Sequence, residues 1–293
     1  MSQLVKKIRT EAGDLQIDYN ALANLPTISN PNLLINGDFQ IWQRGESFSN
    51  ISNKYTADRW MIKNAKSNTP LVEKSVATPP AEPMCQSMYI KDTVNENTYL
   101  AYNFEHAIKG TYTLSFWYLS TTQISTYTHD NGSYVKLMDI AACSDWKHVS
   151  VSFHANAVDF INIIHAMNAG ECYITGVKLE VGTTVTPFVP KLYAQEVADC
   201  QRYYEKRNVI FFPYTGVAPT TNYVAVNGGE HAVTKRVIPT VTMGTFLDRT
   251  NVTLSVGISK ITQSVDGLRM IQTSASCDQY FLGVDVTFDA EIY

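Results

Sequence analysis

The sequence lacks the short motifs that carry common catalytic and metal-binding chemistry. It has no H-E-x-x-H pair, no G-x-S-x-G nucleophile turn and no P-loop. Its five cysteines are widely spaced, odd in number and form no C-x-x-C pair, which argues against a zinc ribbon and against a secreted disulfide framework. We therefore expect free, mostly buried thiols, and we assign no catalytic residue, no metal ligand and no cofactor.

Long apolar runs and an excess of positive charge are missing as well. No apolar stretch approaches the roughly 20 residues that span a bilayer, and none follows the basic residues Lys6, Lys7 and Arg9. We expect neither membrane insertion nor a signal peptide, and hence assembly in a cytoplasm. The net charge is -4, whereas a nucleic-acid binder carries a basic face. We expect no nucleic-acid partner.

The residues that are abundant favour strands. Hydrophobic residues make up 45% of the 293 positions. There are 17 tyrosines and 12 phenylalanines but only 4 tryptophans. Many other positions are Thr, Val, Ile, Ser or Asn, a mixture that favours strands and turns over long helices. At roughly 100–200 residues per domain, the length predicts about two domains. The predicted fold class is mainly β.

Residues 32–190 are predicted to form an antiparallel jelly-roll β-sandwich. Some segments of strand length alternate between apolar and polar residues, and others are apolar runs. They occur at Asn32–Phe39, Tyr112–Leu119, Trp146–Phe153, Asp159–His165 and Cys172–Glu180. Turn signals separate most of these runs, at Lys109-Gly110, Asp130-Asn131-Gly132, Ala169-Gly170 and Val181-Gly182. Many short strands separated by turns are typical of a sandwich or jelly roll.

Two further segments flank this predicted domain. Residues 1–31 are too short and too thinly apolar to fold alone, which predicts an arm that orders against partner chains. Residues 191–293 are predicted to form a smaller C-terminal β domain after a hinge at Thr186–Pro190. It should begin with a short helix within Leu192–Tyr204 and continue as strands, one of them at His231–Val237.

Several distinctive segments follow one another along the chain: Gln16–Pro26, Asn32–Gly45, Tyr55–Trp60, Ile174–Gly182, Thr186–Phe188, Cys200–Tyr204, Val237–Thr242 and Asp289–Ile292. Their content and order resemble a family of bacteriophage tail-fibre proteins whose central domain is related to carbohydrate-binding jelly rolls. The first segment is similar to the attachment segments of phage and prophage fibres. Trp42 and Trp60 lie inside the framework segments, so we expect them to pack in the core.

The resemblance implies a homotrimeric, non-catalytic receptor-binding protein in the virion tail of a phage or a phage-tail-like particle. The N-terminal arm would attach to a tail or baseplate protein, and the partner outside would be a host surface glycan. Two alternatives stay open. One is a structural baseplate or collar component without receptor binding. The other is a glycan depolymerase, which needs two facing carboxylates that the sequence cannot bring together.

Candidate site residues combine aromatic rings, which pack on sugar C–H groups, with side chains that pair with hydroxyls. For glycan binding these are Tyr127, His129, Asp130, Asn131 and Tyr134 in one predicted hairpin, and Tyr214, Asn222 and Tyr223 in the C-terminal domain. For tail attachment they are Leu15, Ile17, Tyr19, Leu22 and Leu25. Asp38 and Glu180 carry hard oxygen ligands that suit calcium, but carboxylates at strand ends are common and we assign no metal site to them.

Overall fold

A computed structural model describes residues 7–10, 13–16, 29–64, 70–93, 98–211, 223–246, 254–272 and 282–293. Within these ranges the chain is mainly β with one helix, α2 (Tyr193–Gln201), which confirms the predicted fold class. The strands are β1 (Lys7–Thr10), β2 (Gly13–Gln16), β3 (Ser47–Phe48), β4 (Lys54–Tyr55), β5 (Trp60–Asn64), β6 (Leu71–Ser75), β7 (Ser87–Asp92), β8 (Thr98–Ser120), β9 (Ile124–Asp130), β10 (Ser133–Ile140), β11 (Lys147–Met167), β12 (Gly170–Val181), β13 (Tyr204–Phe211), β14 (Tyr223–Glu230), β15 (Thr240–Phe246), β16 (Leu254–Ile261), β17 (Val265–Gln272) and β18 (Leu282–Asp289).

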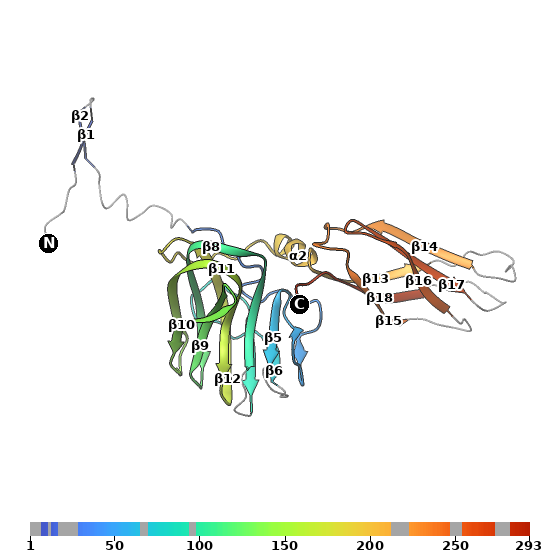
Figure 1. Cartoon of the computed structure of the whole chain (residues 1–293), viewed down its shortest axis with the longest axis horizontal. Helices are drawn as coiled ribbons and strands as arrows, with labels where there is room; N and C mark the ends of the chain where they lie inside the picture. The colour runs from blue at the N-terminus through green and yellow to red at the C-terminus, as the bar shows by residue number, and fades with distance from the viewer. Residues whose placement is uncertain are drawn as a thin grey trace.

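Two long strands, β8 and β11, take part in both layers of a β-sandwich (Figure 1). The order of the main antiparallel sheet is β10-β9-β11-β8-β12-β7-β6-β3, and β5 pairs with both β8 and β4. The first part of β8 pairs with β5 and its last part pairs with β12, while β11 pairs with β8 from one end to the other. Since both strands are far longer than the usual 5–6 residues and bend midway, one continuous sheet folds over into two layers.

The bend has a local cause in each long strand. Gly110 lies inside β8 with a φ of +121°, a backbone conformation that residues with a Cβ rarely adopt. Opposite it, the register of β11 shifts between Ala155 and Val158, as at a β-bulge. The predicted turn at Lys109-Gly110 is therefore wrong, because the chain bends there without leaving the sheet. Trp146–Phe153 and Asp159–His165 likewise belong to a single bent strand.

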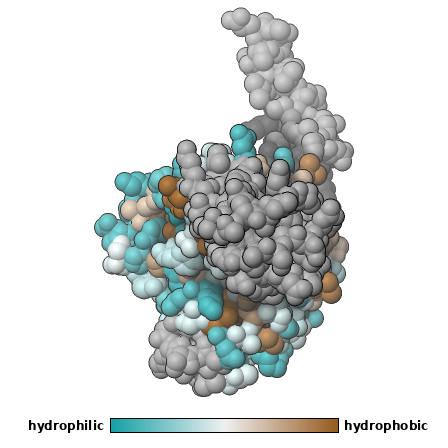
Figure 2. Space-filling view, turned by 90° about the vertical axis from the view of Figure 1, so that its right-hand side faces the viewer, coloured by the Kyte–Doolittle hydropathy of each residue, from teal (hydrophilic) through white to brown (hydrophobic). Residues whose placement is uncertain are grey.

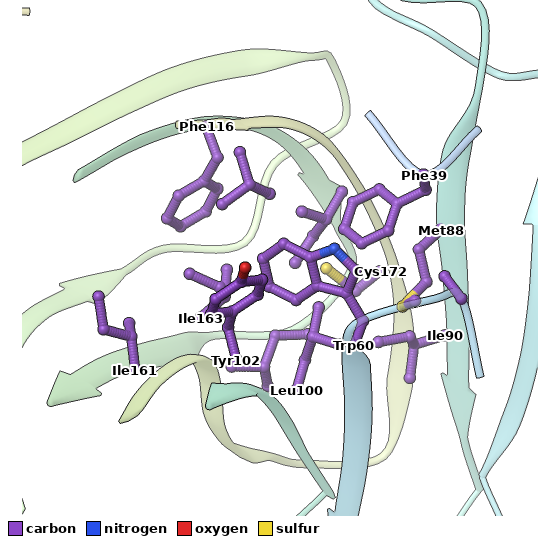
Figure 3. Close-up of a cluster of buried hydrophobic side chains, with 14 of the residues drawn as sticks. Phe39, Trp60, Met88, Ile90, Leu100, Tyr102, Phe116, Ile161, Ile163 and Cys172 are labelled. Carbon is purple, nitrogen blue, oxygen red and sulfur yellow. The ribbon is translucent and has the colours of Figure 1, made fainter. Parts of the chain in front are cut away.

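The core lies between the two layers and centres on Trp60 (Figure 3). Its ring is fully buried, with ring centroids 5.1 Å from Phe39 and 5.1 Å from Tyr102. The indole Nε1–H, which would be costly to bury without a partner, donates to Asn36 O at 2.8 Å. Trp42 is also buried, so the expectation that both tryptophans pack in the core is confirmed.

The apolar run Asn32–Phe39 is not a regular strand. Asn36 and Phe39 have φ values of 57° and 54°. The run lies beside β12, to which it is joined by backbone hydrogen bonds from Leu33 N to Leu179 O and from Val177 N to Gly37 O. A Cβ at Gly37 would lie 2.1 Å from Val177 O, so this close approach requires glycine. The side chain of Asn36 then bonds to Ile41 and Asp58, which fixes the irregular loop on the core.

The C-terminal strands form two three-stranded sheets, β13-β18-β15 and β14-β17-β16. The expected strand at His231–Val237 is absent from the structure of that segment. Instead the segment buries Lys235, whose Nζ donates to Gln201 O at 2.6 Å and to Glu205. The hydrogen bonds of this buried ammonium hold the segment in an irregular backbone conformation. The division of the chain into 1–31, 32–190 and 191–293 stays a prediction.

Helix α2 confirms the predicted helix, and one of the two residues that it buries is charged. Ala194 is exposed, whereas Glu196 and Cys200 are buried. Glu196 accepts a hydrogen bond from Asn36 N, which attaches the helix to the irregular loop of the sandwich. Figure 1 shows α2 between the sandwich and the C-terminal strands.

A buried ionic network joins the end of the chain to the sandwich. Arg59 pairs with Glu291, and Arg44 bridges Glu291 and Asp58 at 3.2 Å each. The side chains of Asp58 and Glu291 are 0% exposed, and that of Arg59 is 1% exposed. Buried charges of this kind are tolerated only when they are paired and hydrogen-bonded.

Tyrosine rings at the start of the C-terminal sheets cover the same arginines. The guanidinium carbon of Arg59 lies 3.6 Å from the ring centre of Tyr203, and that of Arg44 lies 3.5 Å from the ring centre of Tyr204. A guanidinium group is planar. Its face can stack on an aromatic ring while its N–H groups, which lie in the guanidinium plane, donate to carboxylates at its edge. The network therefore fixes the C-terminal sheet β13-β18-β15 on the sandwich at a defined position.

The described cysteines are free thiols, as expected, but only some of them are buried. Cys172 and Cys200 are buried, Cys143 is partly buried, Cys85 is exposed, and Cys277 lies outside the described residues. No described helix is long and apolar enough to cross a membrane. The coloured surface that Figure 2 shows mixes hydrophilic and hydrophobic residues, with no large continuous hydrophobic area.

The ionic network generates a stability prediction. Replacing Glu291 by Gln should lower the free energy of unfolding by about 3–5 kcal/mol, because two buried guanidinium groups lose their shared carboxylate. Glu46→Gln is the matched control: Glu46 is 67% exposed and pairs with Lys74 at the surface, where a pair contributes about 0–1 kcal/mol. Denaturant unfolding of both variants measures the difference. Equal losses would contradict the structural role of the network.

Candidate functional site

A tight hairpin connects β9 and β10 at the edge of the sandwich. Asp130 pairs with Ser133, so only Asn131 and Gly132 form the turn, with φ values of 50° and 80°. Two consecutive residues at positive φ match a type I′ turn, for which Asn-Gly is the preferred pair. The predicted hairpin is confirmed, and the predicted binding residues Tyr127, His129 and Tyr134 lie along its strands rather than at its tip.

Six rings gather on one outer surface of the sandwich, which we call the aromatic face: Tyr99, Tyr127, His129, Tyr134, Phe160 and His165. Strand register explains how they meet. Directly opposed residues point to the same side of a sheet, and Tyr134 of β10 is paired with His129 of β9, which is paired with Phe160 of β11. Inward-facing neighbours on β9 are buried, so alternate residues divide between core and surface.

The rings contact one another closely. Tyr127 stacks on His165 with centroids 4.1 Å apart, and His129 stacks on Phe160 at 4.6 Å with an angle of 8° between the planes. Tyr134 lies between the two stacks, 5.2 Å from His129 and 4.9 Å from His165. It is 56% exposed, the most accessible large apolar surface on the hairpin. The result is a partly exposed aromatic surface supported by paired strands.

Polar groups accompany the rings. Asn162 is opposite Tyr127 in the ladder and 2% exposed, and its Nδ2 donates to His165 Nδ1 at 2.8 Å, while its Oδ1 has no partner among the described residues. Burial lowers the pKa of His165, so the ring is neutral at pH 7. His129 Nδ1 lies 2.7 Å from Asp159 Oδ1. Donors and acceptors for hydroxyl groups thus stand beside apolar ring faces.

Asp130 has a structural role in the same hairpin. It is 8% exposed, and its carboxylate accepts hydrogen bonds from the backbone N–H groups of Asn156 and Ala157 and from Asn156 Nδ2. Burial alone would raise the pKa of Asp130, but these bonds outweigh it and hold the pKa below its ordinary value. The carboxylate clamps the bend of β11, so its oxygens are already engaged within the chain.

Most of the other predicted site residues lie outside the described residues. Tyr214 and Asn222 lie outside the described residues, and Tyr223 begins β14, where only its backbone pairing with Gln272 is described. Of the predicted attachment residues, Leu15 is in β2 opposite Ile8, and Ile17, Tyr19, Leu22 and Leu25 lie outside the described residues. Their roles stay predictions.

The two carboxylates considered for calcium have other partners. Glu180 is 0% exposed and accepts hydrogen bonds from Thr186 N and Oγ1 at 2.8 and 2.6 Å. The ammonium of Lys178, 1% exposed, lies beside it and donates to Ser29 Oγ at 2.8 Å. Asp38 accepts from Gln40. Among the residues described, no group of three or more His, Cys, Asp or Glu side chains could hold a metal ion.

Sequence reasoning missed Tyr99, Phe160 and His165 as members of the aromatic face. Phe160 and His165 lie within the predicted strand Asp159–His165, whose apolar pattern does not single them out as site residues. The available signal was an aromatic ring, an amide and an imidazole inside that run, at Phe160, Asn162 and His165. Only the register between β9 and β11 shows that they share a face with the hairpin residues.

Comparisons with known proteins yield distant structural matches. The scan against protein-family models and the search of curated proteins found no match. Among solved structures, the enzymatically active domain of tailspike protein 4 from bacteriophage CBA120 matches 46% of this chain at 12% identity with a TM-score of 0.37, and the match covers 22% of that chain. The carbohydrate-binding module TmCBM61, solved with β-1,4-galactotriose, matches 52% of this chain and 99% of its own at 15% identity and a TM-score of 0.37.

A mutant of a family 29 carbohydrate-binding module also matches, over 46% of this chain and 89% of its own, at 8% identity and a TM-score of 0.31. Likenesses at this level assign neither a ligand nor a biological role to this chain. The tail-fibre resemblance of the sequence segments likewise stays a prediction.

The clamp at Asp130 predicts a pH-dependent contribution to stability. Asp130→Ala should lower the free energy of unfolding by about 1.5–3 kcal/mol, because the part-buried backbone N–H groups of Asn156 and Ala157 lose a charged acceptor. Because the folded pKa of Asp130 is below its unfolded value, this stabilisation is present above about pH 4 and is lost as the pH falls through the folded pKa. Thermal unfolding at pH 7 and pH 3 measures both effects. Asp145→Asn, an exposed carboxylate bonded only to Ser144, is the control, and an equal effect there would contradict the clamp.

Proposed function

We propose that this chain binds a saccharide on the aromatic face and acts, without catalysis, as a receptor-binding tail-fibre protein. The observation that carries the proposal is the row of partly exposed rings across β8, β11, β9 and β10, with hydrogen-bonding groups between them. Sugar rings present apolar C–H patches and many hydroxyls, so a site for them combines flat aromatic surfaces with a few fixed polar groups.

The strands make this face suitable for a weakly bound, extended ligand. Tyr127, His129 and Phe160 are on paired strands, so their spacing is set by the ladder and little ordering is needed on binding. Ring planes at different angles, stacked for His129 on Phe160 and nearly perpendicular for Tyr134 on Phe160, offer surfaces to more than one sugar unit. A homotrimer would present three such faces and multiply weak binding by about 10²–10⁴.

A non-catalytic role is supported by the carboxylates on this face. Glycoside hydrolysis needs one carboxyl group that is protonated near neutral pH and a second carboxylate opposite it. Hydrogen bonds from Ser125 and Lys136 lower the pKa of Asp139, which makes it a poor proton donor. Asp159 is paired with His129. The depolymerase alternative has no specific observation in its favour.

The tail-fibre role, the trimer and the attachment through residues 1–31 are supported by the ordered sequence segments that resemble phage fibres. The arm is joined to the sandwich at Ser29 and Asn30, which bond to Pro187 and Thr186. A structural baseplate or collar component without receptor binding is the alternative that experiment must separate.

The aromatic face predicts a binding defect without a stability defect. Tyr134→Ala should weaken binding to glycans or host cells about tenfold, about 1.4 kcal/mol, with the melting temperature nearly unchanged, because Tyr134 is 56% exposed. Tyr193→Ala is the matched control, since Tyr193 is 63% exposed but lies on α2. A glycan array and a cell-adsorption assay measure the effect. No binding by the unmodified protein to any glycan or strain would favour the structural component.

The arm gives a second prediction. Deleting residues 1–28 keeps Ser29 and its bonds to Pro187 and Lys178, so the melting temperature should stay the same while incorporation into the particle is lost. Light scattering of the intact and shortened chains measures the mass of the assembly, which the proposal expects to be three chains. A monomer at every concentration would contradict the trimer, and normal incorporation would contradict the attachment role.

A further inference from the structure

Among the residues that the structure describes, one basic side chain beside the aromatic face has no carboxylate partner. Of the basic side chains around the rings, Lys136 pairs with Asp139 at 3.1 Å, and His129 Nδ1 lies 2.7 Å from Asp159. Lys63, at the opposite side of the face on β5, has no carboxylate within 4.0 Å among the residues that the structure describes. Asp159 acts on it only at longer range.

The ammonium of Lys63 is fixed against the aromatic face. Register places Lys63 opposite Tyr99, and its Nζ lies 4.0 Å from the ring centre of Phe160. Nζ donates one hydrogen bond, to Asn103 Oδ1 at 3.2 Å. An ammonium has three N–H donors, so two remain for a ligand. The cation is held beside rings on which a sugar can lie.

The surroundings of Lys63 disfavour an uncompensated charge. The side chain is half-buried, and burial lowers the pKa of Lys63. An anionic group placed against Nζ would offset that cost, because charge-assisted hydrogen bonds in a partly desolvated site are stronger than neutral ones. The net charge of -4 does not prevent this, since charges beyond about 8 Å are largely screened at physiological salt.

We infer that the saccharide bound on the aromatic face is acidic, and that its anionic group pairs with Lys63 Nζ while its sugar rings lie on the aromatic face. This inference rests on the proposed saccharide binding and adds the chemical class of the ligand. A sugar carboxylate and a sugar phosphate share the required chemistry. Lys63 supplies a single charge, which matches one acid group for each bound segment.

The test begins with the unmodified protein and paired ligands. Oligosaccharides that contain hexuronic or sialic acids are measured by calorimetry beside their carboxyl-reduced neutral forms, and phosphate-bearing oligosaccharides form a third arm. The expected result is at least tenfold tighter binding of an acidic form than of its neutral counterpart, with affinity falling as salt rises. Comparing the carboxylate and phosphate arms identifies the source of the charge.

Variants then assign the effect to one residue. Lys63→Met should remove the preference for the acidic form, so that the affinity for that form falls about tenfold, towards the affinity for the neutral form. Lys63→Arg keeps the charge and should retain the preference. Lys147→Met is the control, because Lys147 is an exposed lysine in the part of β11 that belongs to the other layer.

The outcomes separate this inference from the proposed function. Equal affinity for acidic and neutral forms would overturn the acidic ligand and leave saccharide binding standing. A preference that Lys63→Met retains would overturn the role of Lys63. Absence of binding in all three arms would overturn the proposed saccharide binding and this inference together. Because the ligand pairs are measured on the unmodified protein, the test holds even if a variant fails to fold.

Discussion

The pairing of β8 with β11 through a shared bend is the constraint on which the sandwich depends. Each strand contributes one half to each layer, so a single register sets the position of both sheets and of the core between them. Gly110 permits the bend in one strand, and the carboxylate of Asp130 holds the bulge in the other. The same half of β11 that is bent toward β9 carries Phe160 and His165, so the bend also assembles the aromatic face.

A second constraint is the buried ionic network at the end of the chain. Glu291 follows the last strand and neutralises two arginines that belong to the first residues of the sandwich. Tyr203 and Tyr204 stack on those arginines from the start of the C-terminal sheets. Paired, stacked and excluded from water, these groups have few alternative arrangements. The junction therefore holds the C-terminal sheet β13-β18-β15 in a fixed orientation relative to the sandwich.

The aromatic face and Lys63 together illustrate how a mainly neutral surface can acquire selectivity. Rings provide contact area that many sugars can use, and differences among ligands arise from the few polar groups whose partners are incomplete. Asn162 and Lys63 are such groups: within the part of the chain that the structure describes, Asn162 Oδ1 has no donor and Lys63 has no carboxylate partner. Each is fixed by a strand of the sandwich rather than by a loop, so the pattern they present is constant.

The sequence by itself determined the mainly β class, the helix near Tyr193, the Asn131-Gly132 hairpin and the burial of Trp60, because these follow from local periodicity, turn chemistry and side-chain size. It did not determine that Gly110 lies within a strand, because the sequence does not distinguish a glycine at positive φ in a turn from one in a bent strand. Nor did it predict the contact of Tyr127 with His165 or that of Arg59 with Glu291, because these residues are 38 and 232 positions apart. Those contacts were decided by strand register and by the docking of the chain end, which depend on the whole packed structure and not on any local pattern.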